Sequence, residues 1–414
     1  MKSEFLNILE ARGFIHQATN LGGLDAYLAK TPDAKAYIGF DCTAPSLHVG
    51  SLVQIMMLRH FQKCGHQPIV LMGGGTTRVG DPSGKTESRK LLSAEDIKQN
   101  IKGIEKNFIN LLNVSKQRQH IYLNNDGWLK DLNYINFLRD VGRHFTINKM
   151  LTMDSVKLRL EREQPLTFLE FNYMILQAYD FVKLFEDEGC RIQLGGSDQW
   201  GNIVNGIDLG RRMLGAELFG LTSPLITTSD GEKMGKTAKG AVWLSPDQLS
   251  DYDYWQFWRN AQDEDVGRFL RFFTDLPLNE IEKLEVLEGQ ELNAAKKALA
   301  NEATALCRGK AAAIAVSATA IKTFEEGKSG PDLPTIEVSV ARLKKGVPIL
   351  DLYVEAGLCS SKKEARRLIQ QGGARLNDGI ISDENLLVNT AMLGPNNALK
   401  LSAGKKRHAL VKLR

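Results

Sequence analysis

The chain has 414 residues, of which 43% are hydrophobic and 25% are charged, and its formal net charge is +4. This composition is typical of a globular protein and excludes a disordered, collagen-like or membrane-embedded chain. At roughly 100 to 200 residues per domain, the length predicts two to four domains and excludes a single small module.

The cysteines are widely spaced, since the closest two, Cys42 and Cys64, lie 22 positions apart. This spacing excludes a CxxC metal or redox pair and favours a reducing, cytoplasmic compartment. His60, Cys64 and His66 lack a fourth ligand, so we expect them to pack rather than to bind a metal. We expect neither a signal peptide nor a membrane span, because the sequence has no apolar run of 18 residues.

The first part of the chain alternates short apolar runs with helical patterns. Residues 36–40 and 68–72 have the pattern of buried strands, each followed by a glycine-rich turn and then a helix. This βαβ order predicts an α/β fold with a parallel sheet between helices. Further along, residues 279–324 are rich in Ala, Leu, Glu and Lys, which predicts a mostly helical region.

The C-terminal part is basic, because residues 342–414 hold 14 Lys or Arg against six Asp or Glu. Such an end is typical of a chain that meets a polyanion, most often nucleic acid, although a solvated basic surface explains the charge about as well. Ser361 with Glu364 predicts a capping box, and residues 377–379 predict a hairpin turn. Turn residues cluster at 326–334 and indicate a linker. The domains that we predict are 1–240 and 241–325, then a linker at 326–346, and a last domain at 347–414.

Two loops are candidate phosphate sites. The first, residues 41–51, follows a predicted strand and opens a helix; a helix N-terminus beside Gly50 is an anion site to which Thr43 and His48 add donors. Alone, this pattern is more typical of a helix cap. The second, residues 230–237, places two lysines around a glycine, which suits a polyphosphate but is alone more typical of a solvated turn.

Two further patterns suit a small polar ligand. Residues 195–201 follow an apolar run, and their glycines let a ligand approach the backbone, although a tight loop before a helix has the same pattern. Tyr173, Gln177 and Asp180 are spaced to share one face of a helix. They form an unusual core stripe but a good lining for an amino-acid pocket, to which Asp81 would add a carboxylate.

Two motif matches fail. Residues 80–86 resemble a phosphate-binding P-loop, but three residues separate the glycines where that motif needs four. No GxGxxG motif follows a predicted strand, which argues against a dinucleotide-dependent oxidoreductase.

The two phosphate loops together resemble the HIGH and KMSKS signatures of class I aminoacyl-tRNA synthetases, in that order and about 185 residues apart. Strings at 37–41, 80–84, 177–180 and 195–202 closely resemble the bacterial tyrosyl-tRNA synthetases. The resemblance implies a Rossmann-like catalytic domain, an α-helical domain on the tRNA anticodon side, and a small α+β RNA-binding domain similar to ribosomal protein S-four.

The resemblance also implies the reaction: L-tyrosine and ATP form tyrosyl-adenylate, and tyrosine then passes to the 3′ end of tRNA(Tyr). It implies Mg²⁺ with the ATP, no tightly bound protein-ligated metal, and a homodimer. The implied tyrosine contacts are Tyr37 and Asp180 at the phenol, Asp81, Tyr173 and Gln177 at the ammonium, and Gln199 at the carboxylate. The implied ATP contacts are Gly39, Asp41, His48, Gly50, Asn125, Gly195, Asp198 and Lys236. The implied catalytic residues around the pyrophosphate are Thr43, His48, Lys233, Lys236 and Thr237.

The implied RNA contacts form two pairs spaced i, i+4, Lys362 with Arg366 and Lys363 with Arg367. Like charges at this spacing repel on an isolated helix, and a phosphate partner would relieve that repulsion.

Two positions depart from the signatures. Ser51 stands where HIGH has its second histidine, although it keeps a hydroxyl, and Gly235 stands where KMSKS has its first serine. The second departure is usual in this branch of the family.

Three other functions fit parts of the sequence. A tryptophanyl-tRNA synthetase shares the architecture, but the pair Tyr37 and Asp180 and the basic C-terminal module argue against it. An RNA-binding regulator on an inactive synthetase scaffold is disfavoured by the intact His48, Asp198 and Lys233. A small-molecule adenylyltransferase would have no use for the long chain after residues 230–237, which we call the lysine loop.

Overall fold

The computed structural model describes residues 1–83, 92–115, 118–231, 234–237, 240–324, 333–394, 398–404 and 407–414. For residues 236–237 and 321–324 it describes the backbone alone. Lys233 and most of the predicted turn-rich stretch 326–334 lie outside the described residues. Within the described part of the chain, no helix is both long and apolar enough to cross a membrane.

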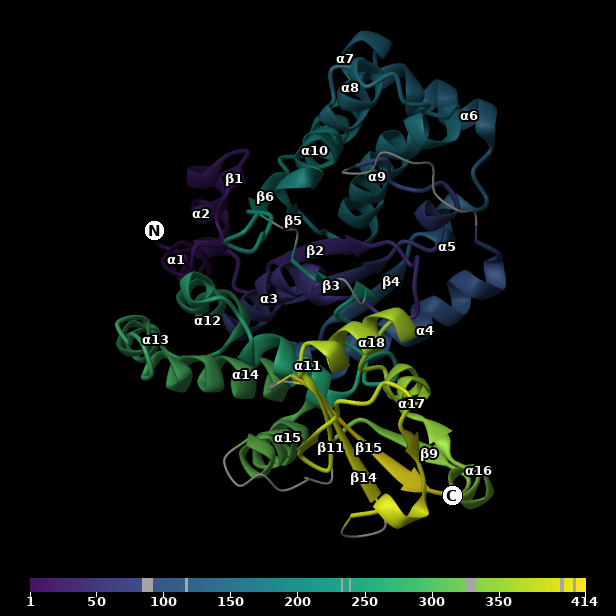
Figure 1. The fold of residues 1–414 in the computed structure, drawn as a ribbon. Coiled ribbons are helices and arrows are strands. Elements are labelled where there is room, and N and C mark those ends of the chain that lie inside the picture. The colour runs from purple at the N-terminus through teal and green to yellow at the C-terminus, as the bar shows by residue number, and fades with distance from the viewer. Residues whose placement is uncertain are drawn as a thin grey trace.

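A six-stranded sheet forms the centre of the N-terminal half (Figure 1). Its strands are β1 (Gln17–Ala18), β2 (Lys35–Phe40), β3 (Gln67–Met72), β4 (Ile121–Asn124), β5 (Ile192–Gly196) and β6 (Phe219–Ser223). The order is β1-β6-β5-β2-β3-β4, and only the edge strand β1 is antiparallel to its neighbour. β3 and β5 are almost continuously buried, as expected for parallel strands covered on both faces. The strands predicted at 36–40 and 68–72 are confirmed.

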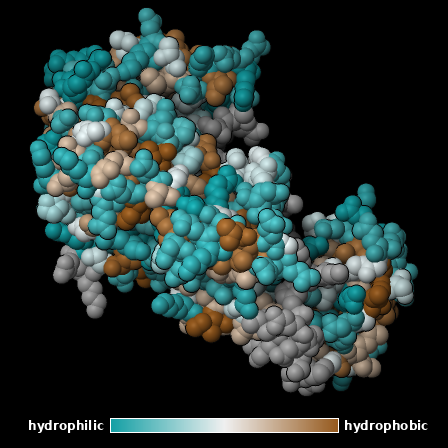
Figure 2. All heavy atoms as spheres, turned by 90° about the vertical axis from the view of Figure 1, so that its left-hand side faces the viewer, coloured by the Kyte–Doolittle hydropathy of each residue, from teal (hydrophilic) through white to brown (hydrophobic). Residues whose placement is uncertain are grey.

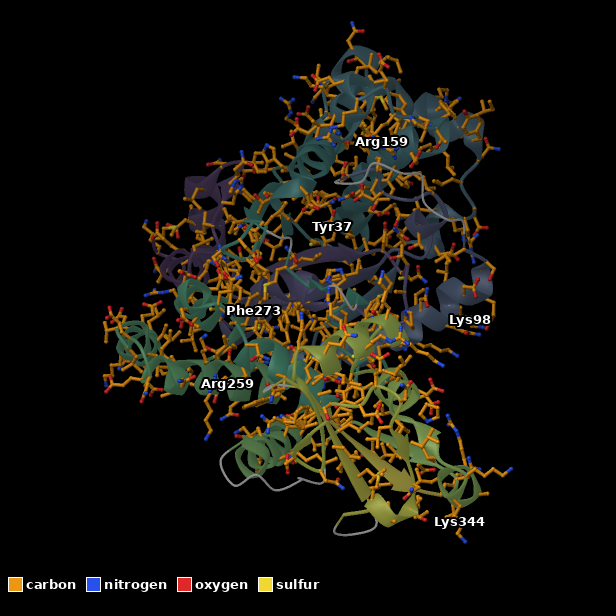
Figure 3. The ribbon with its side chains drawn as sticks, viewed as in Figure 1. Tyr37, Lys98, Arg159, Arg259, Phe273 and Lys344 are labelled. Carbon is orange, nitrogen blue, oxygen red and sulfur yellow. The ribbon has the colours of Figure 1, made fainter. Side chains whose placement is uncertain are left out.

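Helices cover both faces of this sheet. Alternate residues of β2 point to opposite sides, so that Ile38 joins a core with α1 to α4, whereas Tyr37 packs with Phe181 and Leu184 of α9. Figure 3 places Tyr37 deep in this half of the molecule. The helices are α1 (Glu4–Arg12), α2 (Leu21–Lys30), α3 (Val49–Lys63), α4 (Ala94–Leu111), α5 (Asp126–Leu129), α6 (Tyr134–Asp140), α7 (Ile147–Leu151), α8 (Asp154–Glu161), α9 (Phe168–Glu188) and α10 (Trp200–Leu214).

A buried ion pair fixes the start of α9, the helix that carries three predicted pocket residues. Arg159 of α8, labelled in Figure 3, is 2% exposed and its Nη2 lies 2.9 Å from Glu170 Oε1. The other oxygen of Glu170 accepts from Thr167 and completes a capping box. Because Glu170 satisfies both the helix end and the guanidinium, α8 and α9 are held at one orientation.

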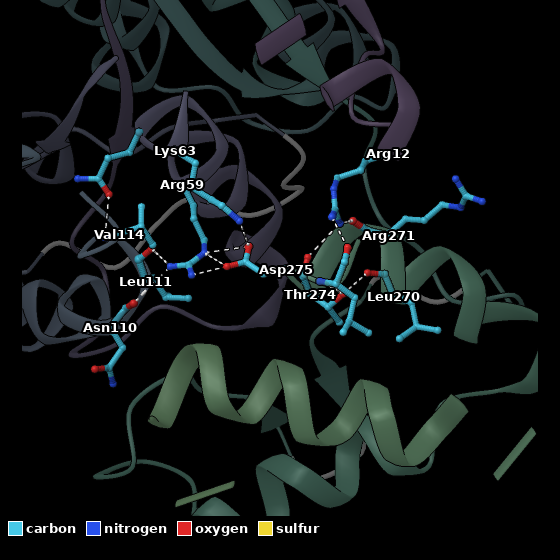
Figure 4. A network of polar contacts seen from close by, with 12 residues as sticks. Arg12, Arg59, Lys63, Asn110, Leu111, Val114, Leu270, Arg271, Thr274 and Asp275 are labelled. Carbon is cyan, nitrogen blue, oxygen red and sulfur yellow. Dashed lines mark hydrogen bonds and ion pairs between the residues drawn. The ribbon is translucent and has the colours of Figure 1, made fainter. Parts of the chain in front are cut away.

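A helical region follows the sheet. It contains α11 (Asp251–Arg259), α12 (Val266–Phe273), α13 (Leu278–Glu285), α14 (Leu292–Arg308) and α15 (Lys310–Phe324), which confirms the helices predicted at 279–324. Figure 4 shows the polar network that joins this region to the first half. Arg12 of α1 donates to three backbone carbonyls at the end of α12, and Arg59 of α3 donates to both oxygens of Asp275.

The C-terminal part has its own core and a five-stranded sheet in the order β12-β11-β14-β15-β9. Its elements are β9 (Thr335–Val338), α16 (Val340–Lys344), β10 (Val347–Pro348), α17 (Ile349–Glu355), α18 (Lys362–Gln370), β11 (Ala374–Leu376), β12 (Gly379–Ile380), β13 (Leu387–Val388), β14 (Ala398–Ala403) and β15 (Arg407–Leu413). β10 and β13 form a separate pair, and short 3₁₀ turns occur between elements across the chain. In Figure 1 this part lies at the lower right, with the helical region to its left.

Two expectations for this part need correction. The predicted linker of residues 326–346 extends too far, because β9 pairs in parallel with β15 and α16 follows it directly. Ser361 does cap α18 by accepting from Glu364 N, but the Glu364 carboxylate bonds to Ser360 and leaves the capping box incomplete.

The hairpin turn at 377–379 is confirmed. Asn377 and Asp378 have φ values of 48° and 67°. Positive φ at both central residues is the backbone that a two-residue hairpin turn requires, and Asn and Asp tolerate it better than most residues.

The surface seen from the side of α1 and α2 is mostly hydrophilic, with hydrophobic side chains in small groups (Figure 2).

Candidate active site

The candidate site is a cavity of about 370 Å³ at the carboxyl ends of β2 and β5. From β2 the chain adds β3 and β4 on one side of the sheet and later adds β5 and β6 on the other. Parallel α/β sheets bind ligands at such a switch in strand order, because the loops on either side diverge and leave a crevice.

The cavity brings together almost all the residues predicted for the site. Those that line it are Tyr37, Gly39, Asp41, Thr43, His48, Gly50, Asp81, Asn125, Tyr173, Gln177, Asp180, Gly195, Asp198 and Gln199. The backbone of Lys236 and Thr237 forms the short strand β7 (Lys236–Thr237), which pairs with β8 (Gly240–Ala241).

One end of the cavity carries Asp180 next to Tyr37. The Asp180 carboxylate accepts hydrogen bonds from Trp128 Nε1 at 2.7 Å and from Asn125 Nδ2 at 2.9 Å. Burial raises the pKa of Asp180 to about 7, although these two hydrogen bonds act to lower it and the negative charge of Asp41 acts to raise it. Burial likewise holds the pKa of Tyr37 well above its usual value, so this phenol remains a hydrogen-bond donor.

The middle of the cavity carries a connected set of polar side chains. Gln199 Nε2 donates to Asp81 Oδ2 at 2.9 Å, and Gln177 Nε2 lies 3.4 Å from Gln199 Oε1. Tyr173 donates its hydroxyl to the Asp41 carboxylate at 3.3 Å. Carboxylates and amide oxygens facing one space can hold an ammonium group, and the amide N–H groups can hold a carboxylate.

Three polar atoms of residues that line the cavity are buried without a hydrogen-bond partner among the described residues. They are Tyr37 Oη, Gln177 Oε1 and Gln193 Oε1. An unpaired buried polar atom costs roughly 1 to 3 kcal/mol. A ligand with a hydroxyl at one end and an ammonium nearer the middle would satisfy Tyr37 Oη and Gln177 Oε1.

The part of the cavity predicted to bind phosphate is lined by the start of α3. His48 caps this helix, and its Nδ1 accepts from Gly50 N at 3.0 Å. The described part of the second signature lies against it: a Cβ on Gly235 would be 2.9 Å from Gly50 N. Gly235 also has φ +89°, so both its conformation and its close approach require glycine at this departure from KMSKS. Ser51 lines the same cavity.

Sequence reasoning missed several residues of the cavity region, including Trp128, Gln193 and Trp243. Trp128 donates a hydrogen bond to Asp180 from α5, just beyond the end of β4. Its position just after a parallel strand is the one sequence signal that could have identified it. Gln193, in β5, is the sheet partner of Tyr37 and lines the wall. Trp243 also lines the cavity, and no local pattern marks it.

Comparison with known proteins identifies the family. Residues 29–325 match the family described as tRNA synthetases class I (W and Y), and residues 350–392 match the S4 domain. The tyrosine–tRNA ligase of Rhodospirillum rubrum is 59% identical over 413 residues, which cover 100% of this chain and 98% of the relative. That of Xanthobacter autotrophicus is 58% identical over 411 residues, with 99% and 98% covered.

A solved structure agrees with these matches. The C-terminally truncated mitochondrial tyrosyl-tRNA synthetase of Aspergillus nidulans is 32% identical, with a TM-score of 0.70 over 77% of this chain and 94% of that chain. The chain therefore belongs to the class I tRNA synthetases and, within them, to the tyrosine–tRNA ligases.

Proposed function

We propose that the cavity activates L-tyrosine with ATP and then transfers tyrosine to the 3′ end of tRNA(Tyr), with release of pyrophosphate and AMP. The observation that carries this proposal is one cavity that brings together the pair Tyr37 and Asp180, the polar side chains around Gln177 and the helix N-terminus at His48. The tyrosine carboxylate is ionised at neutral pH, so it attacks the α-phosphate without a general base. The residues then act by positioning and by stabilising charge.

In this proposal, Tyr37 and Asp180 contact the tyrosine hydroxyl. Tyr37 donates a hydrogen bond from its unpaired Oη to the substrate hydroxyl, and the Asp180 carboxylate accepts a hydrogen bond from that same hydroxyl. Asp81, Tyr173 and Gln177 hold the ammonium, and Gln199 lies near the carboxylate. The contacts of Asn125 support a positioning role toward Asp180 in addition to its predicted place beside ATP.

Tyrosine binding is expected to weaken about tenfold between pH 8 and pH 6. The ionised carboxylate of Asp180 accepts a hydrogen bond from the tyrosine hydroxyl, and its pKa of about 7 means that protonation at lower pH weakens this bond. A titration of the tyrosine Kd against pH tests this. Asp180→Asn should bind more weakly at pH 8 and lose the pH dependence. A wild-type Kd that is flat from pH 6 to pH 8 would contradict the assignment.

The nucleotide lies, in this proposal, along Gly39, Asp41, Gly195 and Asp198, with Gly50 at the phosphates. Thr43, His48, Lys233, Lys236 and Thr237 surround the departing pyrophosphate. Mg²⁺ bound with the ATP would add positive charge at the phosphates. Here the helix N-terminus and the cationic side chains meet the negative charge that grows as the pyrophosphate leaves.

We propose the domain division 1–240, 241–325 and 347–414, with β9 and α16 added to the start of the last domain, and we propose that this domain binds RNA. Four basic residues of α18 were predicted to contact RNA, and all four are exposed. Lys362 pairs with Asp351 and Arg366 pairs with Glu384, so these two charges are partly neutralised within the domain. Lys363 and Arg367 have no ion pair among the described residues, which favours them as phosphate contacts.

We also propose a homodimer in the cytoplasm. Large apolar side chains are exposed on α6, α7, α8 and the first turn of α9. They are Tyr134, Ile135, Leu138, Ile147, Leu151, Leu158, Leu160, Phe168 and Leu169. Clustered exposed apolar groups of this kind mark interaction surfaces, and a second copy of the chain is the partner that the resemblance predicts.

The wild-type protein is expected to sediment at twice its chain mass of 46.0 kDa, and Ile135→Asp should shift it to the monomer. Ile135 is 69% exposed, so a charge there is harmless to a monomer but costly in a buried interface. The matched control is Ile314→Asp on α15, where the side chain is 70% exposed. Equal masses for wild type and both variants would contradict this placement of the interface.

The activity itself is tested by ATP–pyrophosphate exchange without tRNA, with tyrosine, tryptophan and phenylalanine in turn. Exchange with tyrosine alone supports the proposal. Exchange with none of the three amino acids would contradict it and favour an RNA-binding scaffold.

A further inference from the structure

The backbone after the lysine loop contacts both signature segments, and we call residues 242–245 the support segment. Hydrogen bonds of 2.9 and 2.8 Å join Val242 and Leu244 to the residues on either side of His48, which makes a short antiparallel bridge. In the other direction, Val242 N donates to Gly235 O at 3.0 Å. The spacing between the two signatures therefore depends on this segment.

Arg308, the last residue of α14, holds the support segment from outside the cavity. Its Nη2 donates to Trp243 O at 3.0 Å and to Leu249 O at 3.2 Å. Its Nη1 lies 3.7 Å from Asp251 Oδ1, and its guanidinium lies 4.8 Å from the centroid of the Tyr254 ring. The side chain is only 1% exposed. Arg308 is thus a buried cation with four contacts, in a helix that lies outside the cavity.

Trp243 lies between Arg308 and His48 and contacts both. It is the bridge partner of His48, and the two rings meet edge to face with centroids 6.3 Å apart. Both rings line the cavity. The other end of the support segment is fixed by a hydrogen bond, which Ser245 N donates to Ser46 Oγ at 3.0 Å. A shift of the Trp243 peptide would therefore move His48.

We propose that Arg308 is a positioning residue for the adenylation step. By holding Trp243 O, it keeps His48 and the lysine loop at the spacing that stabilises the departing pyrophosphate. This inference rests on the proposed roles of those two elements. The physical reason for a large effect is that displacement of a charged group by about 1 Å can reduce a rate by 10²-fold.

The test is Arg308→Lys. Lysine keeps the charge beside Asp251, but a single ammonium group cannot reproduce the planar fork that reaches two carbonyls and a carboxylate together. We expect the single-turnover rate of adenylate formation, at saturating tyrosine and ATP, to fall about tenfold. We expect the Kd for tyrosine to stay within about twofold, because the hydrogen bonds of Asp180 and Gln177 to other described residues do not involve the support segment.

The matched control is Arg271→Lys. Arg271 also lies in the helical region, forms a bidentate pair with Glu285 and donates to Ala11 O in the first half of the chain. Among the described residues, the hydrogen bonds of its side chain go to Glu285 and Ala11 and not to either signature segment. The control should keep the wild-type rate of adenylate formation, and it should lose less thermal stability than Arg308→Lys because its ion pair is 29% and 26% exposed.

The inference is overturned if Arg308→Lys forms adenylate at the wild-type rate, or if its tyrosine affinity falls together with the rate as in general loosening. His48→Asn, measured alongside, distinguishes a failure of this inference from a failure of the proposed function. A slow His48→Asn with a normal Arg308→Lys overturns this inference alone, whereas a normal His48→Asn overturns the proposed function of the signature loop.

Discussion

Replacement of His48 by Asn is expected to slow tyrosyl-adenylate formation by roughly 10² or more, with little change in tyrosine affinity. Asn remains a good helix cap, so α3 should keep its first turn while the imidazole is lost. The imidazole acts on the charge that develops on the pyrophosphate, and this charge is absent when tyrosine alone is bound. Lys233→Ala should have an effect of the same order for the same reason.

Rapid-quench single-turnover kinetics measure the rate, and equilibrium dialysis measures tyrosine affinity. The exposed residues His16 and Lys98 provide matched controls as His16→Asn and Lys98→Ala, which should behave as wild type. Normal adenylate formation in both signature variants would remove these residues from the catalytic assignment. A loss of tyrosine affinity that accounts for the whole effect would do the same.

Rejection of phenylalanine is the second large effect. Phenylalanine would leave Tyr37 Oη without a partner and would bury the Asp180 carboxylate against a ring edge. Sites of this kind reject the analogue by roughly 10⁴ to 10⁵ in kcat/KM, and tyrosyl-tRNA synthetases are themselves the reference case for that ratio. Tyr37→Phe removes the hydroxyl that phenylalanine would leave unpaired. The ratio of kcat/KM for tyrosine to that for phenylalanine should therefore fall by roughly 10-fold or more.

Exchange kinetics with tyrosine and with phenylalanine give the two kcat/KM values. Tyr27→Phe is the control, because the same hydroxyl is removed from a half-buried side chain that is not among the residues lining the cavity. An unchanged ratio in Tyr37→Phe would show that Tyr37 does not contact the phenol. A ratio that falls equally in the control would point to a general loss of packing.

The helical face with Tyr173, Gln177 and Asp180 was predictable, because helix geometry alone places residues at this spacing on one side. The strand that carries Tyr37 was predictable for a similar reason, since an apolar run between turn signals has few other solutions. The hairpin at Asn377 follows from local turn chemistry. These predictions depend only on residues close in sequence.

The sequence by itself thus determined the order of the elements and the chemical groups that each one offers. Only the tertiary structure decided which of those groups meet. Trp128 reaches Asp180, and Arg308 reaches Trp243, across 52 and 65 positions. Similarly, β9 completes the C-terminal sheet beside β15. Such contacts depend on how whole elements pack. The local sequence pattern shows which face of an element is buried, but it does not identify the distant residues that this face will contact.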